Sequence, residues 1–141
     1  MTREEIEALL LIRRQKALDD LDPPALTALH AEDSVIESAM AGTITGRHGI
    51  EQFYQSLFTS FPDFKFEPEE LLIDGDRVAQ RATFGGTNIG GFMGLAPTGK
   101  QIRVPGVFLF TLRDHQIIRL RSVYDFTLML VQIGVLKIKP T

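Results

Sequence analysis

Four segments with strand character follow one another in the second half of the chain, and they constrain the fold more than any other feature. They span residues 64–73, 77–87, 101–113 and 117–125. Asp74-Gly75-Asp76 joins the first two and is a strong signal for a tight antiparallel hairpin. Another strand is predicted over residues 34–40, with a short partner that ends at Gly46. A mostly antiparallel sheet is therefore expected.

Helical signals lie mainly ahead of these strands. Thr2 and Glu5 have the spacing of a capping box, and a stripe of apolar residues continues to about Asp20. Asp22-Pro23 has the residues that begin a second, short helix. The clearest helix runs over residues 50–61, where apolar side chains recur at helical spacing until Pro62 follows. We expect an α+β fold, with about three helices on one sheet in a single domain over residues 1–141.

The composition excludes several classes of function. The charges are balanced, with 15 basic and 18 acidic residues, so nothing favours binding to nucleic acid. Without cysteine the chain has no disulfide and no thiolate ligand, and its 3 histidines lack metal-ligand spacing. We therefore expect no metal site. We see no signal peptide and no apolar run long enough to cross a membrane, so a cytoplasmic location without membrane contact is expected.

Asp125 ends the last strand and directly precedes a short helix. Side chains alternate along a strand, so Arg121 and Asp125 share one face. We expect both to face one cavity, where a carboxyl group in apolar surroundings suits acid–base chemistry. Arg121 would then hold Asp125 or an anionic group of the substrate. The alternatives are that Asp125 is a helix N-cap and that Arg121 is a solvated surface residue.

Three motifs, in this order, resemble the SnoaL-like polyketide cyclase family. They are Phe61-Pro62-Asp63-Phe64, the glycine-rich segment 85–100, and the run from Asp125 to Gly134. The resemblance implies a cone-shaped α+β fold of the nuclear transport factor 2-like superfamily, with a strongly curved sheet. It also implies cofactor-independent ring closure of a polyketide-like molecule, in which the residue that matches Asp125 is the proposed acid–base group. Members of this superfamily commonly form homodimers, which we also expect here, with residues 104–112 in the interface.

The chain departs from the family at two positions where histidine is usual: Ser38 and Asn88. Both still offer polar groups that can orient a substrate carbonyl, although Asn88 is equally suited to a turn. The candidate catalytic residue is thus Asp125. The candidate substrate-binding residues are Arg121, Asn88, Ser38, Arg81, Phe53, Phe92 and Met93.

Two other functions remain open. Limonene-epoxide hydrolases share the superfamily and use an Asp-Arg-Asp relay. Asp125 with Arg81 or Arg121 would supply part of that relay, but Thr83 stands where a second aspartate is needed. The other alternative is a non-catalytic module that binds a small hydrophobic or aromatic molecule.

Overall fold

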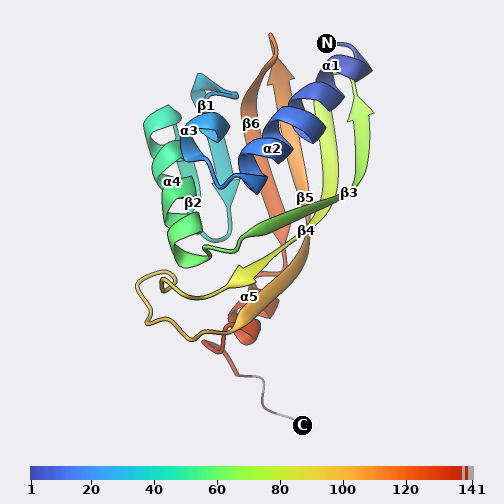
Figure 1. The fold of residues 1–141 in the computed structure, drawn as a ribbon. Coiled ribbons are helices and arrows are strands. Elements are labelled where there is room, and N and C mark those ends of the chain that lie inside the picture. The colour runs from blue at the N-terminus through green and yellow to red at the C-terminus, as the bar shows by residue number, and fades with distance from the viewer. Residues whose placement is uncertain (138, 140–141) are drawn as a thin grey trace.

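A curved sheet covered by helices forms the molecule, as a computed structural model of residues 1–137 and 139 shows (Figure 1). The six strands are β1 (His30–Ser38), β2 (Gly42–Thr45), β3 (Lys65–Asp74), β4 (Arg77–Thr87), β5 (Gln101–Arg113) and β6 (Gln116–Tyr124). Their order in the sheet is β2-β1-β6-β5-β4-β3, and every neighbouring pair is antiparallel except β1 and β6. The predicted fold class is confirmed.

The helices are α1 (Arg3–Glu7), α2 (Arg14–Asp19), α3 (Pro23–Thr27), α4 (Arg47–Ser60) and α5 (Phe126–Gln132). Thr2 and Glu5 make the expected capping box, and Asp22 caps α3. The first strand begins at His30 rather than at residue 34: His30 pairs with Ile117 of β6, and the register with β6 shifts between His30 and Val35. Such an irregularity is difficult to read from the sequence, since it interrupts the alternation of buried and exposed residues.

A π-helical segment, η1 (Ala8–Arg13), joins α1 to α2 and was not predicted. Ile6, Leu10, Arg14 and Leu18 are all buried, although each lies four residues after the one before. An α-helix has 3.6 residues per turn, so a repeat of four drifts around its axis. The wider turn of a π-helix opposes this drift and keeps all four side chains toward the sheet. Arg14 is thereby directed into the core.

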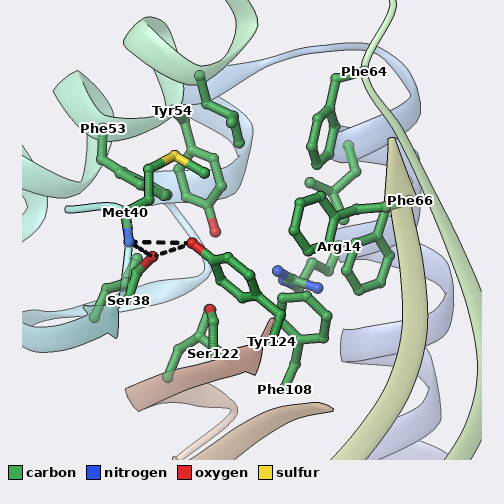
Figure 2. A pocket seen from close by; sticks show the side chains of 15 residues that line it. Arg14, Ser38, Met40, Phe53, Tyr54, Phe64, Phe66, Phe108, Ser122 and Tyr124 are labelled. Carbon is green, nitrogen blue, oxygen red and sulfur yellow. Dashed lines mark hydrogen bonds between the residues drawn. The ribbon is translucent and has the colours of Figure 1, made fainter. Parts of the chain in front are cut away.

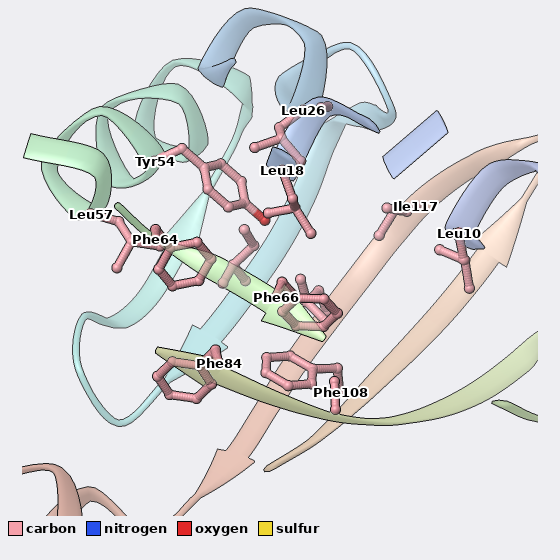
Figure 3. Close-up of a cluster of buried hydrophobic side chains, with 14 of the residues drawn as sticks. Leu10, Leu18, Leu26, Tyr54, Leu57, Phe64, Phe66, Phe84, Phe108 and Ile117 are labelled. Atoms are coloured by element: carbon pink, nitrogen blue, oxygen red, sulfur yellow. The ribbon is translucent and has the colours of Figure 1, made fainter. Parts of the chain in front are cut away.

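Aromatic and aliphatic side chains fill the space between the helices and the inner face of the sheet (Figure 3). Phe84 of β4 and Phe108 of β5 point inward, where they face Tyr54 and Leu57 of α4. The neighbouring positions on the strands point to the opposite, outer face. Arg81 of β4 is exposed on that face. This alternation decides which residues are able to meet inside the molecule.

Two of the sequence motifs contact one another beside the end of α4. The carboxylate of Asp63 accepts hydrogen bonds from the backbone N and the Oγ1 of Thr87, both at 2.7 Å. The backbone N–H groups of Ile89 and Gly90 both donate to the carbonyl of Ser60, at 3.1 and 3.2 Å. They satisfy a carbonyl that a helix end otherwise leaves without a partner. The glycine-rich segment therefore closes over the C-terminus of α4.

We predict that Gly90→Ala lowers the free energy of unfolding by about 2–3 kcal/mol, because its Cβ must displace backbone. That Cβ would lie 2.0 Å from the carbonyl oxygen of Thr59. Gly42→Ala is the matched control: Gly42 has a φ of +71° but no atom within 4 Å of the added Cβ, so only backbone strain of about 1 kcal/mol is expected. Urea denaturation of both variants checks this. Equal losses would contradict the close approach at Gly90.

Candidate functional site

An inner cavity lies between the sheet and helices α2 and α4 (Figure 2). Its volume is about 50 Å³. Aromatic rings dominate its lining: Phe53, Tyr54, Phe64, Phe66, Phe84, Phe108 and Tyr124. The polar residues of the lining are Arg14, Ser38 and Ser122. The lining thus combines flat apolar surfaces with a few hydrogen-bonding groups, as in small-molecule sites.

A second, outer chamber of about 170 Å³ adjoins this cavity and includes Phe92 and Met93 in its lining. Met40, Phe53 and Leu57 line both spaces and form the partition between them. An apolar cavity that binds benzene measures about 150 Å³, so the inner cavity alone is too small for a ring. Met40 is half-buried, and methionine side chains change rotamer readily. Displacement of the partition would join the inner cavity to the outer chamber, which by itself already exceeds that volume.

The hydroxyl of Tyr124 is held at the cavity wall by two groups from the end of β1 and the turn after it (Figure 2). It lies 3.1 Å from Ser38 Oγ and accepts a hydrogen bond from the backbone N–H of Met40, also at 3.1 Å. Burial raises the pKa of Tyr124 above its ordinary value, although the bonds from Ser38 and Met40 oppose the shift. The phenol therefore keeps its proton at neutral pH and is able to donate it to an acceptor.

Arg14 places a guanidinium group in the same lining, with only 3% of the residue exposed. Its Cζ lies 5.1 Å from the ring centre of Phe66 and 5.0 Å from that of Phe110. Nε and Nη1 are buried and have no hydrogen-bond partner within the part of the chain that the structure describes. Desolvating an ion costs several kcal/mol, of which each buried cation–π contact returns about 2 kcal/mol. The two rings offset part of this cost but leave the N–H donors of Arg14 unfilled.

His30 adds no charge to this region. Its Nδ1 lies 2.9 Å from Ser34 Oγ, and the residue is fully buried. Burial lowers its pKa to about 3, with smaller contributions from the positive charges of Arg14 and Arg47. The imidazole is therefore neutral at physiological pH. The positive charge in the cavity lining comes from Arg14.

Asp125 is exposed and does not line the cavity. It is the N-cap of α5, where its Oδ1 accepts a hydrogen bond from the backbone N of Leu128 at 2.9 Å. Leu120, Ser122 and Tyr124 are the residues of β6 that line the cavity. Alternation then turns Arg121 outward, where 63% of its side chain is exposed and Nε lies 3.8 Å from Glu37. The expectation that Arg121 and Asp125 face the cavity is wrong, because β6 buries the opposite set of side chains.

Arg81 also lies outside the cavity, on the outer face of β4, 3.4 Å from Glu69 and 3.6 Å from Glu70. Neither Arg81 nor Arg121 is placed to form an Asp-Arg-Asp relay in the cavity. Asn88 is 1% exposed, but its backbone groups bond Gly99 and Lys100 and its side-chain amide donates to Thr98. It holds the base of the glycine-rich loop and lines neither chamber, but it is not among the residues with positive φ.

Four of the candidate residues do lie at the two chambers. Ser38 lines the inner cavity, Phe53 forms part of the partition, and Phe92 and Met93 line the outer chamber.

Among the described residues, no group of three His, Cys, Asp or Glu side chains is arranged to hold a metal ion. No helix within residues 1–137 is long and apolar enough to span a membrane.

Comparison with known proteins decides the family. Residues 9–133 match the sequence pattern of the SnoaL-like polyketide cyclases. The chain belongs to this family. No curated protein shows significant sequence similarity to this member of it.

Three solved structures superpose closely on this SnoaL-like protein. AclR of Streptomyces galilaeus, a proposed hydroxylase, is 25% identical, with a TM-score of 0.83 over 99% of this chain and 91% of AclR. A proposed SnoaL-like polyketide cyclase from Jannaschia sp. CCS1 is 25% identical, with a TM-score of 0.81 over 95% and 94%. IdmH of Streptomyces antibioticus, a proposed polyketide cyclase, is 27% identical, with a TM-score of 0.71 over 89% and 96%.

Sequence reasoning missed Arg14 and Tyr124 in this family member, and each left a signal. Arg14 lies midway between Leu10 and Leu18 on the apolar stripe of the first helix, where a charged residue is unusual. Tyr124 shares its strand face with Leu120, whereas the interpretation favoured the face of Asp125. The choice of face needed knowledge of which side of β6 the helices cover.

We predict that Asp125→Ala lowers the free energy of unfolding by about 1 kcal/mol, because α5 loses its N-cap, while Asp125→Asn changes it by less than about 0.5 kcal/mol. Asparagine is an equally good cap, so it serves as the matched control. Chemical denaturation measures the stability of both variants. A loss for Asp125→Asn as large as that for Asp125→Ala would show that the charge, rather than the cap, is what the protein needs.

Proposed function

We propose that this SnoaL-like protein binds a small aromatic, polyketide-like molecule in the joined chambers and acts on it as a cofactor-independent cyclase or isomerase. The observation that carries the proposal is the hydroxyl of Tyr124, which lies in an aromatic cavity against Ser38 and the N–H of Met40. Membership of the family supports the substrate class. The proton donor in this proposal is Tyr124, whereas the sequence analysis expected Asp125 to be the acid–base group.

The proposed chemistry is stabilisation of charge on a carbonyl oxygen. When Ser38 donates to the phenol oxygen, the proton of Tyr124 is free to point into the cavity. It then hydrogen-bonds a substrate carbonyl, on which negative charge develops as the ring closes, in surroundings of low dielectric constant. A 1,3-dicarbonyl substrate supplies its own nucleophile as the enol. The enol carbon attacks the carbonyl carbon and forms the new carbon–carbon bond. The enol loses one proton and the new hydroxyl group gains one, so no proton is consumed overall.

The second candidate is a binding module without catalysis. One observation favours it: the residues that line the inner cavity include no Asp, Glu or His, so no side chain there is an ordinary general base. The same lining would still bind an aromatic molecule through burial of its rings. Activity and binding therefore need to be measured separately.

We predict that Tyr124→Phe lowers turnover of an enolisable aromatic 1,3-dicarbonyl compound about 100-fold, as for loss of one donor to a developing oxyanion. The change keeps the ring and removes only the hydroxyl. Tyr54→Phe is the matched control, since it removes a hydroxyl from the same lining but not from the group with Ser38 and Met40. Consumption of a panel of such compounds is followed by absorbance and chromatography.

Equal turnover by Tyr124→Phe and the wild type would refute the role of the hydroxyl. Wild-type protein that binds the compounds without consuming any of them would favour the binding module.

We also propose a homodimer that pairs the outer faces of two sheets. Leu72, Leu109 and Val123 project from β3, β5 and β6 with 62%, 40% and 50% exposure, an apolar group that a second copy would cover. Sedimentation is expected to give twice the chain mass of 15.8 kDa. Leu109→Glu should give the single-chain mass, while Ile12→Glu, a control on the exposed side of η1, should not. A wild-type mass of one chain would contradict the proposal.

A further inference from the structure

We propose that Arg14 is the anchor for a carboxylate, so that the ligand of the joined chambers is an aromatic acid. This inference rests on the proposed function, because it takes the joined chambers to be the site of an aromatic molecule. It adds that the molecule is negatively charged and that its charged end lies at Arg14. Neither the family match nor the related structures assign a role to Arg14.

The guanidinium lacks acceptors rather than space. Nε and Nη1 of Arg14 are buried without a hydrogen-bond partner among residues 1–137, and the residue is 3% exposed. The rings of Phe66 and Phe110 offset part of the cost of desolvation, but they leave the donors of the group unfilled. A buried cation in this state is strongly stabilised by any ligand that brings negatively charged oxygen atoms to it.

The neighbouring side chains do not supply this negative charge. The other titratable groups in the lining, Tyr54 and Tyr124, are phenols, and His30 is neutral. Arginine offers five N–H donors and no acceptor, so its partner must be an acceptor. The planar fork of the group matches a carboxylate, which is also small and more easily desolvated than a phosphate. A cavity of about 50 Å³ with mostly aromatic walls favours the smaller anion.

A row of aromatic rings connects Arg14 to the hydroxyl group at Tyr124. Successive ring centres lie 4.9 Å apart from Phe66 to Phe108, 6.2 Å from Phe108 to Phe84, and 5.1 Å from Phe84 to Tyr124. The guanidinium lies against the first ring of this row, and the Ser38 hydroxyl meets the last. Figure 2 draws Arg14 and Tyr124 with their polar ends in the same cavity.

A flat ligand would therefore lie along these rings with its carboxylate at Arg14 and a carbonyl or hydroxyl group at Tyr124. The anion fixes one end, and the phenol selects the atom on which charge develops. Arg14 in this arrangement contacts the carboxylate end of the substrate, away from the reacting carbonyl. It therefore sets the orientation of the substrate and the preference for acids.

The test compares 2-naphthoate with 2-naphthamide, which has nearly the same shape but no charge. Titration calorimetry of the wild type is expected to show at least about 30-fold tighter binding of the naphthoate, the lower limit for loss of a buried charge partner. Arg14→Met, which keeps the length and the apolar contacts, should bind both compounds with equal affinity. Arg13→Met is the matched control on the neighbouring, exposed arginine and should retain the full preference.

Thermal melting separates ligand binding from a purely structural role. If Arg14 is an unsatisfied buried charge, Arg14→Met melts at or above the wild-type temperature, and naphthoate raises the melting temperature of the wild type only. A purely structural arginine would instead make Arg14→Met melt lower, and naphthoate would raise both proteins equally. Arg14→Lys keeps the charge and should keep part of the preference, which provides a second variant if Arg14→Met does not fold.

The outcomes are distinct. Equal binding of the two compounds by the wild type, or an undiminished preference in Arg14→Met, overturns the role of Arg14 and leaves the aromatic site in place. Failure of both compounds to bind the wild type refutes the aromatic site, and the inference is refuted with it.

Discussion

The alternation of side chains along β6 determines which of its polar groups line the cavity. Leu120, Ser122 and Tyr124 face the helices, and Arg121 and Val123 face away. A strand offers only two faces, so the side that the helices cover receives one complete set of residues. A phenol instead of a carboxylate therefore lies in the cavity. The ion pairs of Glu37 with Arg119 and Arg121 then belong to the outer face of the sheet.

The sequence was sufficient for the fold because its signals are local. The Asp74-Gly75 turn, the apolar spacing over residues 50–61 and the order of three motifs each depend on a few neighbouring residues. They predicted the helices, the four C-terminal strands and the family. The site depends instead on which face is covered and on the phase of the first helix, and both are settled by tertiary packing. Ser38 was found through the family resemblance, and Phe53 was found because it lies on the apolar stripe of a helix.

The first helix illustrates why phase escapes local reasoning. Its apolar residues predict a regular helix to about Asp20, and the structure has helical backbone there. The single departure, the π-helical η1, alters no residue type and leaves no breaker such as proline or glycine. Yet it aligns Arg14 with Ile6 and Leu10, and this alignment brings a cation into an aromatic core. π-helical turns of this kind are often retained at functional sites.

Met40 has two separate contacts with the site. Its side chain is part of the partition between the chambers, whereas its backbone N–H, fixed in the turn after β1, holds the phenol of Tyr124. Rotation about the side-chain bonds would open the partition without moving the backbone donor. A smaller or larger residue at position 40 would likewise change the size of molecule admitted and preserve the hydrogen bond. The size of the joined chambers and the hydrogen bond to Tyr124 are thus independently variable at one position, so a substitution there would reshape the space and leave the hydroxyl group in place.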